Sequence, residues 1–195
     1  STYTDAGATA TDNYDGDLTD NIVLVSTVDE TTVGVYTLTY NVTDANGNVA
    51  VEVTRTVNVV DTTVPVITLT GESTVIIEFG STYTDAGATA TDNYDGDLTD
   101  NIVLVSTVDE TTVGVYTLTY NVTDANGNVA VEVTRTVNVV DTTVPVITLL
   151  GEATVTIEVG STYTDAGATA TDNYDGDLTD NIVLVSTVDE TTVGV

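Results

Sequence analysis

Hydrophobic and polar residues alternate along the segment "VYTLTYNVT" (115–123), in which Tyr116, Leu118, Tyr120 and Val122 are separated by polar residues. A period of two predicts a β-strand with one buried face. The segment "VAVEVTRTVNVV" (129–140) predicts the returning strand, with valines on one inward face: Val129, Val131, Val133, Val137 and Val139. Between the two strands, "DANGN" contains an Asn-Gly pair that tolerates positive φ, so we expect a hairpin there.

Four further segments predict short strands upstream of this hairpin. They are "PVITL" (65–69), "STVIIEF" (73–79), "YTDAGATAT" (83–91) and "NIVLVSTV" (101–108). Six or seven short strands separated by turn residues, without a helical period, favour an all-β domain. We therefore predict a β-sandwich of the immunoglobulin (Ig) type.

The sequence consists of copies of one internal repeat. Residues 1–61 recur unchanged as 81–141, and residues 1–35 recur again as 161–195, so the repeat is 80 residues long. Only four positions differ where 62–80 is matched with 142–160, namely Thr70/Leu150, Ser73/Ala153, Ile76/Thr156 and Phe79/Val159. Eighty residues suit one small domain and exceed a solenoid repeat. The expected architecture is a rod of tandem Ig-like β-sandwich domains, arranged as beads on a string.

Turn and linker residues place the domain boundaries. In "VVDTTVPVITL", Pro65 suits the beginning of a strand, so a new domain begins near Thr62. The predicted units are a partial repeat at 1–61 that lacks its first strands, a complete repeat at 62–141, and a partial repeat at 142–195 that lacks its last hairpin. We expect the 195 residues to be a window on a longer periodic polymer. The alternative is that the ends are real and that short protomers polymerise by strand donation.

Composition narrows the possible partners. Thirty-one acids and two arginines give a formal net charge of −29, and the sequence contains no Lys, His or Cys. Such a chain is a poor partner for nucleic acid or anionic membrane, and it lacks the usual bases and nucleophiles, so we do not expect an enzyme. No run of residues approaches the ~20 apolar residues of a membrane span, so no membrane insertion is expected in this segment.

The segments "PVITLTGESTV", "GSTYTDAGATATDNYDGDLTDNI" and "VGVYTLTYNVTDANGNVAVEVTRTVNVVD" resemble the Ig-like repeats of bacterial surface proteins. The pattern GxYTxTYxxTDxxGN within them is shared with hyalin (HYR) repeats. The resemblance covers essentially the whole chain. It implies tandem Ig-like modules that serve as stalks in large extracellular adhesins at the cell surface, and it implies no catalytic activity.

The acidic segment "TDNYDGDLTDN" occurs three times and predicts a calcium site. An EF-hand is excluded, because Thr91 and Ile102 fall where that loop requires ligating acids. In a sandwich, however, this loop, the "DANGN" hairpin and the linker lie at one pole, where hard oxygen ligands would suit Ca²⁺. The candidate ligands are Asp61, Asp92, Asp95, Asp97, Asp100, Asp124 and Asn126, with repeat equivalents Asp12, Asp15, Asp17, Asp20, Asp44, Asn46, Asp141, Asp172, Asp175, Asp177 and Asp180.

Two alternatives to calcium remain open at this point. Asp, Asn and Gly are also the residues that turns use, so "DNYDGD" is compatible with two successive turns. The acidic surface is also compatible with that of a halophilic protein. The charge density favours calcium, because each full repeat carries 12 acids and one arginine, and cations would relieve the self-repulsion.

The two arginines and two asparagines have separate predicted roles. Arg135, and Arg55 in the first copy, fall in the inward register of the strand, where an unpaired charge is costly. We expect Arg135 to bend outward at a bulge or to form a bidentate structural salt bridge with Asp85 or Asp92. Asn41 and Asn121 begin the glycosylation sequons Asn-Val-Thr.

Two functions fit these features. The first is a structural stalk or extracellular filament, stiffened by Ca²⁺ at the domain junctions. The second is a repeated weak binding module for glycans or neighbouring filaments, as in adhesion or biofilm formation, that gains avidity by repetition. The expected partners are further copies of the repeat in the same chain, neighbouring chains in a filament, and a glycan or other cell-surface ligand.

Overall fold

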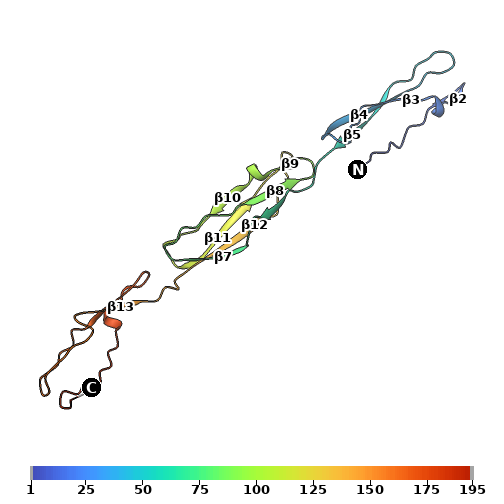
Figure 1. The fold of residues 1–195 in the computed structure, drawn as a ribbon. Coiled ribbons are helices and arrows are strands. Elements are labelled where there is room, and N and C mark those ends of the chain that lie inside the picture. The colour runs from blue at the N-terminus through green and yellow to red at the C-terminus, as the bar shows by residue number, and fades with distance from the viewer. Residues whose placement is uncertain (1, 194–195) are drawn as a thin grey trace. The chain divides into compact units, whose positions relative to one another are not determined.

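The computed structural model describes residues 2–193 (Figure 1). These residues form β-strands and three 3-10 turns, and the described part of the chain contains no α-helix. They divide into two compact units. The first comprises Ser1–Val66, Thr91–Asp100 and Thr123–Ala130; the second comprises Ile67–Ala90, Asn101–Val122 and Val131–Val195. Within residues 2–193, no helix has the length and apolarity that a membrane crossing requires.

The first unit contains one three-stranded antiparallel sheet and small two-residue pairings. The sheet has the order β3-β4-β5, and β1 pairs with β2. The bounds are β1 (Thr11–Asp12), β2 (Gly16–Asp17), η1 (Thr19–Asn21), β3 (Val23–Ser26), β4 (Gly34–Asn41), β5 (Val53–Val59) and β9 (Gly96–Asp97).

The second unit contains the four-stranded sheet β10-β11-β12-β7 (Figure 1). Its pairings are antiparallel except for β12 with β7, which is parallel. The bounds are β6 (Val66–Leu69), β7 (Thr74–Glu78), β8 (Ala88–Asp92), β10 (Val103–Ser106), β11 (Gly114–Asn121), β12 (Val133–Val140), β13 (Val146–Leu149), β14 (Ala168–Asp172), β15 (Gly176–Asp177) and η3 (Thr179–Asn181). Three elements cross the division between the units: β6, whose first residue Val66 belongs to the first unit, β8, whose last residues pair with β9, and η2 (Thr99–Asn101).

The core of the second unit lies between this sheet and the layer of β6 and β8. Alternation along β11 turns Leu118 and Tyr120 inward, each 1% exposed, and alternation along β12 does the same for Val137 and Val139. From β6, Ile67 is also buried. The described residues therefore form the all-β, Ig-like sandwich that the alternating pattern predicted.

One detail of the predicted hairpin is wrong. Val129 and Val131 do not face inward, since they are 54% and 77% exposed. The β11–β12 ladder begins only at Tyr120 and Val133, and the connection folds on itself through an isolated bridge between Thr123 and Val129. The local hydrogen bonds of this connection take Val129 and Val131 out of the ladder, so they do not follow the inward register of β12.

Candidate metal centre

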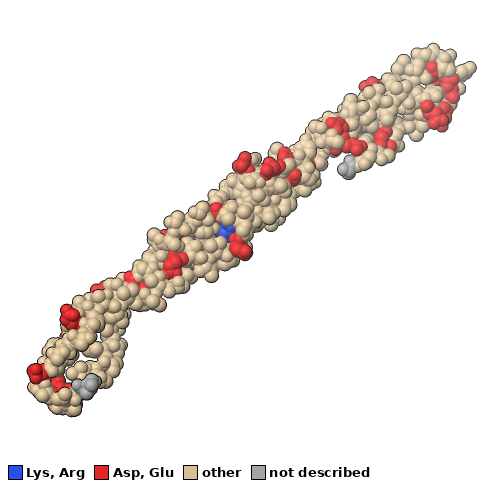
Figure 2. All heavy atoms as spheres, viewed as in Figure 1, with Lys and Arg blue, Asp and Glu red and all other residues tan. Residues whose placement is uncertain are grey.

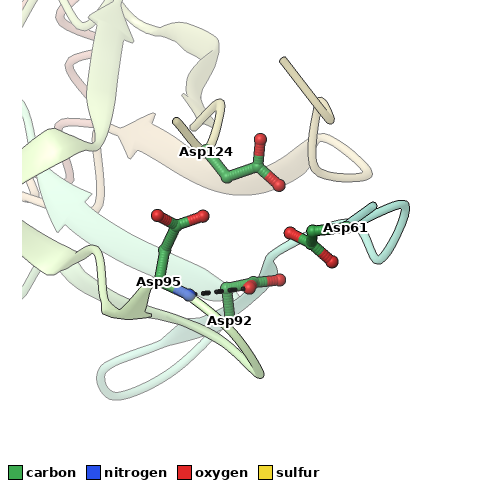
Figure 3. Close-up of side chains that lie close together, drawn as sticks. All are labelled: Asp61, Asp92, Asp95 and Asp124. Carbon is green, nitrogen blue, oxygen red and sulfur yellow. Dashed lines mark hydrogen bonds between the residues drawn. The ribbon is translucent and has the colours of Figure 1, made fainter. Parts of the chain in front are cut away.

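Four of the predicted ligands come together in the first unit. The carboxylates of Asp61, Asp92, Asp95 and Asp124 each offer one oxygen, and these oxygens all lie within 4.8 Å of one another. Figure 3 shows the four side chains arranged around a common space. They come from three separate segments: the linker before β6, the end of β8 with the loop that follows it, and the hairpin connection after β11. Residues far apart in the sequence thus supply one cluster of anionic oxygens.

The loop after β8 orients two of these carboxylates. Oδ1 of Asp92 accepts the backbone N–H groups of Tyr94 (2.7 Å) and Asp95 (3.1 Å), which fixes the Asp92 side chain across the turn. The second bond is the dashed line in Figure 3. Oδ2 of Asp92 and Oδ2 of Asp95 are both buried and have no hydrogen-bond partner. A buried carboxylate oxygen without a donor is costly unless a cation or a water molecule meets it.

Asp124 is the most enclosed member of the cluster, at 7% exposure. Its Oδ1 accepts the N–H groups of Asn126 (2.9 Å) and Asn128 (2.7 Å), and its Oδ2 accepts the Asn128 side-chain amide (2.7 Å). Burial alone raises the pKa of the Asp124 carboxyl, but hydrogen bonds from Asn128, Asn126 and Gly127 together hold that pKa below its ordinary value. Asp124 is therefore held as an anion.

Asp61 is the member of the cluster that belongs to the linker, and its hydrogen bonds hold the linker against the hairpin connection. Its Oδ1 accepts the N–H of Thr63 at 3.1 Å, and its Oδ2 accepts the side-chain amide of Asn126 at 3.4 Å. The side-chain amide of Asn128 also donates to the Asp61 carbonyl at 3.4 Å. Asn126 therefore contacts the cluster through its amide nitrogen, which donates to Asp61 and leaves the carboxamide oxygen as its only possible ligand atom.

Asp97 and Asp100 do not join the four-carboxylate cluster. Oδ1 of Asp97 accepts the N–H of Thr99 at 2.9 Å, and hydrogen bonds from Thr99 lower the pKa of Asp97. Asp100 lies exposed in η2. The equivalent residues behave alike. Oδ1 of Asp17 and of Asp177 accepts the N–H of Thr19 and of Thr179, respectively, at 2.9 Å. Asp20 and Asp180 lie in η1 and η3. Part of the acidic segment thus serves as turn-forming residues.

The other copies hold three carboxylates each. Asp12, Asp15 and Asp44 cluster in the first unit, and Asp141, Asp172 and Asp175 cluster in the second, by the same 4.8 Å measure. Hydrogen bonds from Asp15 and Tyr14 lower the pKa of Asp12, and those from Asn48 lower that of Asp44. In the second unit, burial raises the pKa of Asp141, and the nearby carboxylates of Asp172 and Glu78 raise it further.

Asn46 takes the same place in the first copy that Asn126 takes in the second. Its N–H donates to Oδ1 of Asp44 at 2.9 Å. The first cluster is built of loop and hairpin residues only, and the cluster of the second unit is built of linker and loop residues only. Asp61, Asp92, Asp95 and Asp124 combine all three segments.

Arg135 lies inside the sandwich, with its side chain 1% exposed. One guanidinium nitrogen pairs with Asp85, and the others donate to the carbonyls of Glu72 (3.0 Å), Gly87 (3.1 Å) and Thr70. Burial alone raises the pKa of Asp85, but hydrogen bonds from Tyr120 and Tyr83, together with Arg135, bring it below its ordinary value. The contact with Asp85 is single rather than bidentate, because backbone carbonyls take the remaining donors.

The remaining predicted residues occupy partly buried positions. Arg55 pairs with Asp5 and donates to the Gly7 carbonyl at 3.0 Å, with its side chain 37% exposed. Asn41 and Asn121 end β4 and β11, and each carboxamide oxygen accepts the next backbone N–H, at 2.8 and 2.9 Å.

Sequence reasoning missed a second contact with a linker. Glu78, at the end of β7, accepts the N–H (3.0 Å) and hydroxyl (2.6 Å) of Thr142 and the hydroxyl of Thr143 (2.8 Å). Hydrogen bonds from Thr142, and then from Thr143, lower the pKa of Glu78 to about 2. Beside it, the Phe79 ring meets the Tyr174 ring edge-on, with centroids 5.0 Å apart. The variable position Phe79/Val159 was the only sequence signal near this contact.

Acidic side chains gather in separate groups on the face of the molecule shown in Figure 2.

The family model for the bacterial surface protein Ig-like domain matches residues 1–59, 67–139 and 147–195. The chain belongs to this family. A curated relative, an uncharacterized 81.3 kDa protein of Acholeplasma phage L2, is 33% identical over 186 residues. The match covers 91% of this chain but 25% of the relative, so the chain spans about a quarter of that protein's length.

Two solved structures share part of the chain's sequence. The lipoprotein BT2262 from Bacteroides thetaiotaomicron is 29% identical, over 41% of this chain and 39% of that one, with a TM-score of 0.37. A structure of CBM51-2 in complex with GlcNAc and INT domains from Clostridium perfringens ZmpB is 31% identical, over 50% of this chain and 21% of that one, with a TM-score of 0.33. TM-scores this low do not bear on the site.

Proposed function

We propose that this chain is a structural segment of a bacterial surface protein, in which Ca²⁺ fixes the linker to the domain that follows it. The observation that carries the proposal is the convergence of linker Asp61 with loop residues Asp92 and Asp95 and hairpin residue Asp124, with carboxylate oxygens within 4.8 Å. The family membership supports a cell-surface setting and a structural, non-catalytic role.

The chemistry of the donors favours calcium over softer metals. All four candidate ligands are carboxylates, and the chain has no His or Cys to favour zinc. Four carboxylates this close repel one another, and a divalent cation would offset that repulsion. The buried, unpartnered oxygens of Asp92 and Asp95 support a ligand between them. Ca²⁺ accepts six to eight oxygens in flexible geometry, so carbonyls or waters would complete its shell.

A bound cation would act on the linker. Without it, Asp61 is held to the hairpin by two amide contacts of 3.4 Å, which are at the long end of hydrogen bonding. Coordination by Asp61 together with the loop carboxylates would replace these weak contacts by ionic bonds. The linker would then lose freedom of movement on calcium binding, as a stiff stalk requires.

Isothermal titration calorimetry and thermal melts of the whole chain test the proposal. We expect Ca²⁺ to bind with a dissociation constant of roughly 10⁻⁴ to 10⁻³ M, the range of extracellular modules, and to raise the melting temperature. Asp92→Asn should weaken this binding at the complete cluster. Asp100→Asn, which removes an equal charge from the same loop outside the cluster, is the matched control and should leave it unchanged.

The same measurements can overturn the proposal. If calcium raises the melting temperature no more than sodium chloride of equal ionic strength does, the acidic residues are turn formers on a solvated surface. If Asp100→Asn weakens binding as much as Asp92→Asn does, calcium is attracted by general charge and not by the cluster.

A further inference from the structure

Most of the outer face of the four-stranded sheet is uncharged, and its one acid, Glu78, lies at the end of β7 in register with Val140. The register places Val105, Thr119 and Thr134 side by side on it, and Thr117 beside Thr136. The row of Val115, Asn138 and Ile76 completes it across β11, β12 and β7. We call this set, together with Val103, the uncharged face. All twelve acids of the repeat lie outside it, in loops, at strand ends or near Arg135.

Large apolar side chains stand out from this face into solvent. Val103 is 63% exposed, Val105 58%, Val115 73% and Ile76 68%. Isolated exposed valines are ordinary, but these lie on a single continuous sheet surface. The first copy repeats the arrangement, with Val23 63%, Val25 57% and Val35 74% exposed.

The margin of this face is an open strand edge. β10 pairs only with β11, and all four of its residues, Val103–Ser106, are exposed. Proteins commonly protect such edges with charged residues or proline, because unpaired N–H and C=O groups recruit other chains. β10 has the sequence VLVS and carries neither kind of protection.

We propose that the uncharged face and the edge of β10 form a lateral contact surface for a second copy of this chain. Two observations favour a copy over another partner. A chain of net charge −29 repels its own kind least where acids are absent, whereas a basic partner would go to the acidic loops. The exposed valines also occur in both the first and the second copy of the repeat, so two chains can make the same contact more than once, and each added contact strengthens the others.

Sedimentation velocity of the whole chain across protein concentrations, in EDTA, tests this association separately from calcium binding. At about 10 mM NaCl the Debye length is about 30 Å and repulsion should keep the chain monomeric, whereas at about 1 M it is about 3 Å and association should appear. The double variant Val25→Asp/Val105→Asp should weaken association at least about tenfold, because facing copies would bring like charges together.

The matched control is Val51→Asp/Val131→Asp. These valines are 91% and 77% exposed, lie outside every strand of the described chain, and receive the same added charge. This control should associate as the unchanged chain does, and thermal melts should show that both double variants fold. A chain that stays monomeric at about 1 M NaCl overturns the proposal, as does equal weakening by both double variants.

Discussion

Two regions of the molecule have the same sequence and different packing. Residues 1–61 and 81–141 are identical, and both form the same ladder, β3-β4-β5 in one and β10-β11-β12 in the other. In the second region Val137 is fully buried and Arg135 is 1% exposed, while Arg55 at the equivalent position is 37% exposed in its side chain. Sequence identity thus preserves the strand pairing but not the burial.

The difference comes from β6 and β7. β7 adds a fourth strand beside β12, and the segment between β6 and β7 supplies the carbonyls of Thr70 and Glu72 to Arg135. Residues 2–61 match 82–141, so no described segment beside the first copy corresponds to β6 and β7. Arg55 is left with Asp5 and the Gly7 carbonyl. The same arginine is a buried structural residue in one copy and a half-exposed ion pair in the other.

The largest expected effect is the contrast between Arg135→Leu and Arg55→Leu. Removing Arg135 leaves Asp85 and three backbone carbonyls without their donor inside the sandwich, so we expect a loss of about 3 kcal/mol in the stability of the second region. Arg55→Leu should have a clearly smaller effect, because solvent reaches that pair.

Native-state hydrogen exchange at the amides of Leu38 and Leu118 measures both variants in one chain. The exchange rate of each amide reports the stability of the copy that contains it. The copy without the substitution therefore serves as the internal control. Equal losses of protection at the two leucines would show that the differing burial has no energetic consequence.

An intermediate effect is expected from Gly127→Ala and Gly47→Ala. Both glycines adopt positive φ, 90° and 86°, which an L-side chain tolerates poorly, so each change should cost roughly 1 to 2 kcal/mol. The turn is local, and the costs should therefore be nearly equal in the two copies. Chemical denaturation of the two variants measures this, and a much larger loss for Gly127 would mean that the linker contacts of Asp61 stabilise the turn as well.

The smallest effect concerns pH and the linkers. Because the pKa of Glu78 falls from 4.5 to about 2 on folding, its hydrogen bonds to Thr142 stabilise the linker fully above about pH 4.5. That contribution is lost as the pH falls toward 2. Among the described residues, no hydrogen bond joins the equivalent threonine, Thr62, to a glutamate.

Amide exchange at Thr142 and Thr62, corrected for intrinsic rates, tests this difference. Protection at Thr142 should exceed that at Thr62 at neutral pH and fall to the same level in acid. Glu78→Gln should abolish the excess at every pH. An excess that survives this substitution would contradict the assignment.

Much of the fold was accessible from the sequence because it rests on short-range patterns. The alternation through Leu118 and Tyr120 predicted β11, and Asn126-Gly127 predicted a turn at which Gly127 does adopt positive φ. The predicted inward positions of Val129 and Val131 were wrong, because Asp124 binds the backbone of its own connection and the ladder starts later. A side-chain-to-backbone bond of this kind leaves no mark on the hydrophobic period.

The candidate metal centre was likewise predictable from the sequence only in part. The sequence of the acidic segment showed an excess of carboxylates but not which of them meet. Asp92 and Asp95 join Asp61 and Asp124, whereas Asp97 accepts a backbone hydrogen bond in a turn. That the cluster binds calcium stays a prediction, as do the domain boundaries at 61 and 141.

The sequence by itself determined the strand pattern, the 80-residue repeat and the sign of the surface charge, since these depend on residue type and local spacing. Only the tertiary structure decided which carboxylates meet, that Glu78 reaches Thr142, and that identical arginines differ in burial. These features depend on segments that are distant in the chain, such as β7 beside β12, and the local sequence of a residue contains no information about such neighbours.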